Sequence, residues 1–294
     1  MKILVTGSAG FLGGHVARHL VGSGHEVKGF DAAPNSDTAY ESVIGDLLDT
    51  ESVTSAAEGV DAVCHLGAIG DVYLAAEQPQ LAAAVNVVGS SNVAIAAAEA
   101  GAKVVYASTW EVYGEPEYQP IDEDHPTSPD YPYNITKLAG EQLLLASDRL
   151  QGVPVTALRI GTAYGRGLRP NSVFRIFIDR ARAGEPITIQ GDGSQGRQFT
   201  YAADIASAFE LACRSDAHSI AMNIVAPEVI SIKELAELVV ERFPTDLTFG
   251  EARPGDVPSA LVSPALAEKI LGWRAVTQFE TGLGHLLEDE SDVT

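Results

Sequence analysis

The 294-residue chain has little cysteine, and it contains no long uninterrupted apolar run. Its two cysteines, Cys64 and Cys213, lie far apart in the sequence without metal-ligand spacing, so we expect reduced thiols and no metal site. No apolar run reaches the roughly 18 residues of a membrane span. The N-terminal stretch "MKILVTGSAGFLGG" lacks the apolar segment of a signal peptide. These absences favour a cytoplasmic protein that does not enter a membrane.

Positive charge is also scarce. Lysine and arginine number 19 against 40 acidic residues, which gives a formal net charge of −21. Such a field repels nucleic acid and anionic membranes, so neither is expected as a partner. The scarcity of lysine leaves two interpretations open, an ordinary acidic protein or a surface adapted to high salt. In both cases an anionic ligand would need a local group of arginines.

Apolar residues make up 46% of the chain, enough for a sizeable core. Over the first 160 residues, short β-branched runs alternate with helical patterns, which predicts a parallel sheet covered by helices on both faces. After Arg166 the elements become shorter and richer in Gly, Pro and Arg. We therefore expect an α/β protein with a domain over residues 1–165 and a smaller lobe over 166–294, with some elements exchanged between them. The predicted strands are Lys2–Thr6, Glu26–Phe30, Asp61–Leu66, Lys103–Ser108 and Pro154–Ile160, and two predicted helices span Leu81–Ala100 and Tyr131–Leu150.

A glycine-rich turn, "TGSAGFLGG", follows the first predicted strand directly. Gly7, Gly10 and Gly13 stand three residues apart, with Phe11 and Leu12 between the last two. Glycine lets the backbone turn tightly and approach a pyrophosphate, and the helix that begins here offers free N–H groups at its positive end. A simple strand–helix turn is the alternative. Because the motif lies between a strand and a helix, it predicts a dinucleotide site made by these five residues.

Two acidic residues follow later strands. Asp31 comes 18 residues after Gly13, where a carboxylate accepts hydrogen bonds from ribose hydroxyls and repels a 2′-phosphate. This favours NAD over NADP. Asp46, with its neighbour Leu47, follows a further short candidate strand. Asp46 either contacts the adenine or caps the next helix, and the sequence favours neither.

Tyr133 and Lys137 stand four residues apart on a predicted helix and so share one face. An ammonium about 4 Å from a phenol, at an effective dielectric constant near 20, attracts the phenolate by roughly 4 kcal/mol. That corresponds to a fall in the pKa of the tyrosine of about three units. Tyr133 would then be a general base near neutral pH. The alternative is an ordinary surface pair.

These features together resemble the extended short-chain dehydrogenase/reductase family, specifically its NAD-dependent nucleotide-sugar epimerase/dehydratase branch. The resemblance covers nearly the whole chain. Besides the motifs above, it rests on the stretches "HLGA", "NVVGSSNV", "GDGSQGRQFTYAADIASA" and "RPGDVPSALVSPALAEKILGW". It implies a Rossmann-like doubly wound sheet that binds NAD and a smaller C-terminal α/β lobe that binds the substrate. Further cofactor-binding residues implied by the resemblance are Leu66, Gly67, Ala68 and Asn86.

The resemblance also implies catalytic roles. Thr109 would orient the substrate hydroxyl, with Ser108 as a less favoured stand-in. Tyr133 would move the proton and contact the substrate. Lys137 would hold the nicotinamide ribose and lower the pKa of the tyrosine.

Two arginines, Arg197 and Arg253, match those that grip the diphosphate of the substrate in this family. A guanidinium group suits that bidentate task. They would supply the local positive charge that the acidic chain otherwise lacks. The alternative for both is an ordinary surface position.

Two departures from the family pattern bear on the reaction. Where dehydratases of the family often have Thr-Asp-Glu, this chain has Thr109, Trp110 and Glu111. Indole cannot shuttle a proton, which argues against that dehydratase type, whereas Glu111 keeps elimination or decarboxylation open or is an ordinary loop residue. In "LRIGTAYG", Thr162 replaces an asparagine that commonly helps to hold the substrate phosphate, so the pocket floor, and with it the sugar nucleotide, is expected to differ.

The leading hypothesis is a nucleotide-sugar 4-epimerase, similar to UDP-glucose 4-epimerases, acting through a transient 4-keto intermediate. The alternatives are a dehydratase or decarboxylase that uses Glu111, an NAD-dependent sugar dehydrogenase, and a non-enzymatic NAD-binding scaffold. In this family the helices expected at Leu81–Ala100 and around Tyr133 pair across a two-fold axis, so a homodimer is also expected.

Overall fold

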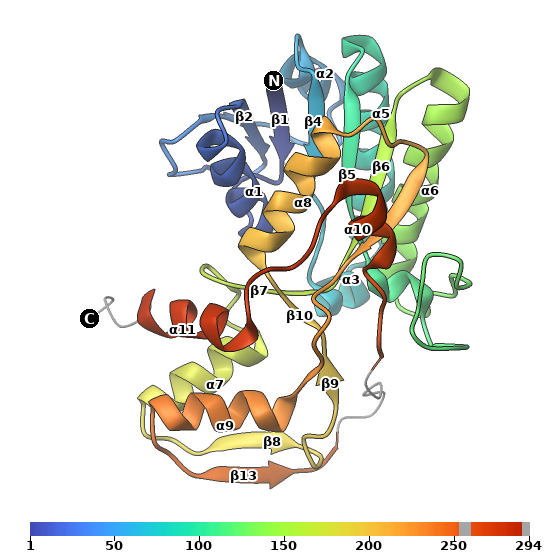
Figure 1. The fold of residues 1–294 in the computed structure, drawn as a ribbon. Coiled ribbons are helices and arrows are strands. Elements are labelled where there is room, and N and C mark those ends of the chain that lie inside the picture. The colour runs from blue at the N-terminus through green and yellow to red at the C-terminus, as the bar shows by residue number, and fades with distance from the viewer. Residues whose placement is uncertain (253–259, 290–294) are drawn as a thin grey trace.

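A parallel seven-stranded sheet forms the centre of the molecule in the computed structural model, which describes residues 1–252 and 260–289 (Figure 1). The strand order is β11-β6-β5-β4-β1-β2-β3, and the order reverses beside β1, as in Rossmann-like sheets. The sequence predicted this fold class, and the structure confirms it. The strands are β1 (Lys2–Thr6), β2 (Glu26–Asp31), β3 (Glu41–Ile44), β4 (Ala62–His65), β5 (Lys103–Thr109), β6 (Val155–Ile160) and β11 (Ile220–Ile224).

Helices cover both faces of the sheet and bury its apolar side chains. On one face lie α1 (Phe11–Gly22), α8 (Ala202–Arg214) and α10 (Ala265–Leu271), with Leu20, Phe209 and Trp273 in the core between helices and strands. The other face is covered by α2 (Thr50–Ala57), α5 (Gly89–Ala100) and α6 (Pro132–Gln151). The carboxyl ends of the strands all meet at one edge, where ligands of such sheets bind.

The helix predicted at Leu81–Ala100 starts two residues earlier and is not uniform. It consists of α4 (Pro79–Ala83), a π-helical turn η1 (Ala84–Val88) and α5. Within residues 1–252 and 260–289, this is the helix that is long and apolar enough to pass a length-and-composition test for a membrane span. Half of its most apolar window is buried inside the fold, as is usual for a helix that covers a sheet.

A second, smaller core lies beyond the sheet edge. It is built around Phe174, Phe199 and Phe279, whose rings pack against Tyr164. Three elements that follow residue 165 belong to the central layers instead: β11 is a strand of the sheet, and α8 and α10 pack on its face. The remaining elements of this region are β7 (Thr162–Tyr164), α7 (Val173–Arg182), β8 (Ile187–Gln190), β9 (Gly196–Arg197), β10 (Phe199–Tyr201), β12 (Ile230–Ser231), α9 (Ile232–Arg242), β13 (Leu247–Gly250) and α11 (Phe279–Asp289).

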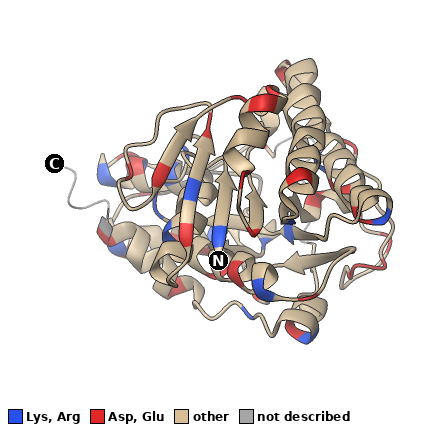
Figure 2. Cartoon of the chain, turned by 90° about the horizontal axis from the view of Figure 1, so that it is seen from above, with Lys and Arg blue, Asp and Glu red and all other residues tan. Residues whose placement is uncertain are grey.

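The excess of acidic residues is spread over the molecule. Figure 2 shows Asp and Glu on helices and loops around the whole outline of the molecule in that view. The two cysteines, distant in sequence, meet in the core between β4 and α8, where the Cys64 and Cys213 sulfurs are 3.5 Å apart as free thiols. Their contact and their burial raise the pKa of Cys64, which keeps it protonated.

Candidate active site

The glycine-rich turn joins β1 to α1 and leaves no space for side chains at two positions. Gly7 has a φ of +72°, and a Cβ there would lie 2.7 Å from the Gly67 nitrogen. At Gly13 a Cβ would lie 1.9 Å from the Gly7 carbonyl oxygen. Gly10 caps α1 without a side-chain hydrogen bond, which leaves the positive helix end open to an anion. The turn therefore fits the pyrophosphate of a dinucleotide.

The turn after β4 lies directly against the glycine turn. Thr6 Oγ1 accepts a hydrogen bond from Gly67 N at 3.1 Å and contacts His65 Nδ1 at 2.7 Å. Burial lowers the pKa of His65 to about 3, so the imidazole is neutral. Leu47 packs beneath the same turn, where a Cβ at Gly67 would lie 2.8 Å from its Cδ1. The predicted cofactor residues Leu47, Leu66, Gly67 and Ala68 are thus gathered at one edge of the sheet.

Asn86 lies behind this turn with its amide used by the protein. Its Oδ1 accepts from Ile69 N at 2.8 Å, and its Nδ2 donates to Thr136 Oγ1 at 3.0 Å. Thr136 in turn donates to the Tyr133 carbonyl at 2.9 Å. Asn86 therefore ties the cofactor-side loop to the start of α6, and the cofactor contact that the resemblance implies for it stays a prediction.

The two acidic residues have separate positions. Asp31 ends β2, and its carboxylate accepts from Ala9 N in the glycine turn at 3.0 Å and from Ala33 N at 2.9 Å. It is placed beside the turn, as recognition of the adenosine ribose requires. The alternative role of Asp46 as a helix cap is wrong, because Asp49 caps α2 through Glu51 N and Ser52 N. Asp46 instead accepts from Leu48 N at 2.9 Å in a tight turn.

The catalytic residues predicted from the sequence meet where β5 ends. Thr109 is the last residue of β5 and caps a short 3₁₀ helix, η2 (Trp110–Tyr113), by accepting from Glu111 N at 3.3 Å. Its side chain also acts on Tyr133 in the first turn of α6, where it opposes the rise in the pKa of that tyrosine. We call residues 108–113 the shelf. A hydroxyl and a phenol in contact can hold a substrate hydroxyl and receive its proton.

The expected effect of Lys137 on Tyr133 is wrong for the protein alone. Burial, followed by the nearby Glu111 charge, raises the pKa of Tyr133, while Arg169 and the Thr109 hydrogen bond oppose the rise. The Lys137 Nζ lies 4.1 Å from the centre of the Tyr106 ring. Burial lowers the pKa of Lys137 to about 7, against the influence of Glu141. The shared helix face was predicted correctly, but desolvation outweighs the pairwise attraction.

Glu111 faces this site. Burial and, secondarily, Asp130 raise the pKa of Glu111, whereas Arg197 opposes the rise. Its charge also acts on Tyr133. A buried carboxyl group with a raised pKa beside a tyrosine and an arginine is typical of a functional position rather than of an ordinary loop residue.

Ser108 does not replace Thr109. Its Oγ donates to Glu141 Oε2 at 2.5 Å, and the residue is only 3% exposed. The hydroxyl is directed to the protein interior, because successive side chains of a strand point to opposite faces of the sheet.

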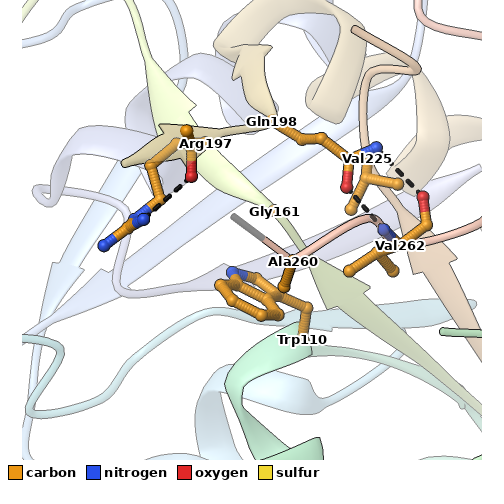
Figure 3. A pocket seen from close by; sticks show the side chains of 8 residues that line it. Trp110, Gly161, Arg197, Gln198, Val225, Ala260 and Val262 are labelled. Atoms are coloured by element: carbon orange, nitrogen blue, oxygen red, sulfur yellow. Dashed lines mark hydrogen bonds between the residues drawn. The ribbon is translucent and has the colours of Figure 1, made fainter. Parts of the chain in front are cut away.

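The substrate side of the site is a small recess. Figure 3 shows the Trp110 indole and Arg197 on one side of Gly161 and the apolar side chains of Val225 and Val262 on the other. Arg197 Nη1 donates to the Gly196 carbonyl at 2.8 Å, and Arg197 lies on β9 at the mouth of the recess. Thr162 lies on β7 opposite Phe199. Arg253, the second predicted arginine, lies outside the described residues.

Sequence reasoning missed a contact between the two halves of the chain. Arg169 Nη1 donates to Gly70 O at 3.3 Å and pairs with Asp71 Oδ2 at 3.0 Å, which Asn171 Nδ2 also contacts at 3.1 Å. The positive charge of Arg169 interacts with Tyr133 and opposes the rise in the pKa of that tyrosine. The segment after β7 thus crosses to the turn after β4, near Tyr133. No spacing in the sequence indicates this pair.

Comparison with known proteins agrees with this geometry. Residues 3–225 match the model of the NAD dependent epimerase/dehydratase family. A UDP-glucose 4-epimerase of Mycolicibacterium smegmatis is 31% identical over 307 residues, covering 98% of both chains. UDP-glucuronic acid decarboxylase 1 of Danio rerio is 30% identical, covering 98% of this chain and 72% of the relative. The structure of MoeE5 in complex with UDP-glucuronic acid and NAD superposes with a TM-score of 0.92 at 33% identity, covering 100% of both chains.

These matches extend over both halves of the chain, and the glycine turn fits the cofactor that the structural neighbours bind. The cofactor is NAD. The chain belongs to the NAD-dependent epimerase/dehydratase family.

Proposed function

We propose that the protein is a nucleotide-sugar 4-epimerase that acts on a uridine diphosphate sugar through a transient 4-keto intermediate. The observation that carries this proposal is the placement of Thr109 at the end of β5 beside Tyr133, whose pKa it lowers, with Lys137 one helical turn further along α6. A relative named UDP-glucose 4-epimerase and one named probable UDP-glucuronate 4-epimerase support it, and they favour uridine diphosphate over the different sugar nucleotide that Thr162 suggested. When bound, NAD supplies the hydride acceptor and, in its oxidised form, a positive charge.

The role of Tyr133 follows from its surroundings. Thr109 would hold the C4 hydroxyl of the sugar, and the Tyr133 oxygen would take its proton and later return it. Because burial and Glu111 raise the pKa of Tyr133 in the protein alone, we expect the phenol to stay neutral until a positive charge enters the site. The proton would therefore move only in the loaded enzyme.

Trp110 favours epimerisation over dehydration. Loss of water needs an acid and a base on the shelf, and Trp110 is only a hydrogen-bond donor. Glu111 is then the single carboxyl group of the shelf. Epimerisation at C4 needs one group that removes and returns a proton at one oxygen, and Tyr133 is sufficient for that.

Arg197 is proposed to hold the diphosphate or an acidic sugar substituent. It lines the recess beside Trp110, and its charge reaches Glu111. In a chain of net charge −21, such a local cation is what an anionic substrate requires. Thr162 and Arg253 remain proposed contacts to the same substrate.

A decarboxylase of a UDP-linked uronic acid is the second candidate, and one observation favours it. Glu111, whose pKa is raised, lies close to both Tyr133 and Arg197. A relative named as a decarboxylase covers 98% of this chain.

The two candidates are separated by incubating the purified protein with a panel of UDP-sugars and following the products by NMR without added NAD. Interconversion of two C4 epimers supports the epimerase. A pentose product with released carbon dioxide would transfer the assignment to the decarboxylase, and a 4-keto-6-deoxy product to a dehydratase. Turnover only after NAD is added, with accumulation of NADH, would contradict both candidates.

A further inference from the structure

A buried ion pair lies beneath the shelf. Arg159 on β6 donates twice to Glu141 on α6, from Nη2 to Oε1 at 2.6 Å and from Nε to Oε2 at 3.2 Å. The Glu141 and Arg159 side chains are 1% and 9% exposed. Burying two charges costs desolvation free energy that is recovered only when the remaining polar atoms are also bonded. The other partners of this pair therefore indicate what it does.

Those partners are the two ends of the shelf. Ser108 Oγ donates to Glu141 Oε2 at 2.5 Å, and Arg159 Nη1 donates to Tyr113 Oη at 2.8 Å. Residues 109–112, which include Thr109 and Glu111, lie between these two anchors. One ion pair thus fixes both ends of the segment that carries the substrate-facing groups.

A third connection leads to the wall of the recess. Tyr113 Oη donates to Asn223 Oδ1 at 2.8 Å, and Asn223 Nδ2 donates to the Ser263 carbonyl at 3.2 Å. The neighbouring Val262 lines the recess and is bound at both backbone groups by the Gln198 amide (Figure 3). The shelf and the recess wall are therefore linked through buried hydrogen bonds.

Glu141 also belongs to the catalytic helix. It follows Tyr133 and Lys137 at successive intervals of four residues on α6, so all three share one face. We propose that Glu141 and Arg159 are positioning residues, which set the separation of Thr109 from Tyr133 and the orientation of Glu111. This inference rests on the proposed function, because it assigns the proton transfer to Thr109 and Tyr133.

Two variants, here called the arm variants, each remove one anchor of the shelf. They test the proposal without leaving a buried charge unpaired. Ser108→Ala removes the contact to Glu141, and Tyr113→Phe removes the contact to Arg159. The matched controls are Ser147→Ala, a buried serine of α6 bonded to its own helix at Leu144 O, and Tyr164→Phe, a buried tyrosine bonded to Phe279 O. Each control deletes the same group at a similar burial but away from the shelf.

The first readout does not depend on activity. The chain has two tryptophans, of which Trp273 is 1% exposed, so acrylamide quenching of the fluorescence of the NAD-loaded protein reports mainly on Trp110 of the shelf. We expect stronger quenching in both arm variants and none of this increase in the controls. Quenching equal to that of the wild type in both arm variants would overturn the proposal.

The second readout is kinetic. A displacement of about 1 Å at the reacting groups costs on the order of 100-fold in rate, so kcat should fall by about 10- to 100-fold in the arm variants with KM nearly constant. In the controls the melting temperature should fall, while kcat and KM stay the same. If the wild type turns over no sugar while quenching still rises in the arm variants, the proposed function fails and the positioning role stands. If the wild type turns over and the arm variants behave like the controls, the positioning role fails alone.

Discussion

At the scale of single residues, Glu111 decides between the two proposed reactions. In an epimerase its carboxyl group only adjusts the electrostatics of Tyr133, whereas a decarboxylase would use it in the chemical step. We expect Glu111→Gln to slow epimerisation at C4 by less than about tenfold, because general acid–base groups contribute about 100- to 10,000-fold. Initial rates measured by NMR give the answer, with the exposed Glu115→Gln as control. A loss of a thousandfold or more would assign Glu111 to the chemistry.

The buried ammonium group of Lys137 should lower the free energy of unfolding of the protein. Its pKa is lowered by burial from about 10.5 to about 7. Between these values the unfolded chain holds a proton that the folded protein has lost, so this group makes the free energy of unfolding rise with pH over that range. Below pH 7 the folded protein must bury the ammonium group.

The variant Lys137→Met removes the buried ammonium group. We expect its melting temperature to exceed that of the wild type below pH 7, with a smaller difference at alkaline pH, and its activity to be lost. Thermal melts across pH measure this, with the exposed Lys269→Met as control. A difference from the wild type that is independent of pH would show that Lys137 is not a buried cation.

At the scale of elements, the glycine turn should determine cofactor retention. Gly13→Ala would place a methyl group 1.9 Å from the Gly7 oxygen, so the turn must open. We expect the purified variant to lose most of its bound NAD, measured in the supernatant after heat denaturation. Gly22→Ala, in the last turn of the same helix with nothing within 4 Å of the added group, should keep its NAD. Equal NAD content in both variants would contradict the role of the glycine turn in binding NAD.

We also propose that the exposed faces of α4, η1, α5 and α6 form a homodimer interface. Leu81, Val88 and Ile95 stand seven residues apart along one side of the helix, and each is at least 37% exposed. Two further exposed apolar residues, Ile135 and Leu143, lie on the adjacent α6. Such a stripe is costly to leave in water.

Val88→Glu tests the interface by adding a charge to each copy at the centre of the stripe. We expect light scattering to give a dimer mass for the wild type and a monomer mass for the variant. Val276→Glu, at an exposed valine in a loop elsewhere, is the control. A monomeric wild type at micromolar concentration would refute the proposal.

The elements that sequence reasoning found share a physical cause. The inner strands are near-continuous β-branched runs because they are buried on both faces. The strand β11, "IAMNI", was missed because it follows a region without clear alternation and pairs with β6, which lies far earlier in the chain. The Glu141–Arg159 network was also missed, although Glu141 lies two helical turns from Tyr133. Its partners lie on or after strands whose order in the sheet cannot be derived from residue spacing in the sequence.

At the scale of the whole molecule, the net charge of −21 should make stability depend on salt. Raising the salt concentration from about 0.1 M to about 1 M shortens the screening length from about 10 Å to about 3 Å, which weakens self-repulsion. We expect the melting temperature to rise over this range, measured by calorimetry with sucrose as the uncharged control. Unfolding at the lowest salt would indicate a salt-adapted surface, and a flat profile would contradict the role assigned to the charge.

The electrostatics of the site depend on the whole fold, whereas the positions of its motifs do not. Motif positions predicted that the glycine turn follows β1, that Asp31 ends β2 and that Thr109 ends β5 near the helix of Tyr133 and Lys137, and the structure places them there, because each follows a strand end or a helix repeat. The direction of the pKa shift of Tyr133 depends on burial, which the pairwise attraction to Lys137 does not include. Burial is a property of the folded molecule rather than of a spacing.

A UDP-sugar substrate labelled with deuterium at C4 tests the proposed 4-epimerase most directly. The labelled sugar is incubated with the purified protein without added NAD, and the label is located by NMR. A 4-epimerase returns the same hydrogen to the same carbon, so we predict deuterium at C4 in both epimers. Deuterium at C6 of a deoxy sugar, or its loss from the sugar, would contradict the account.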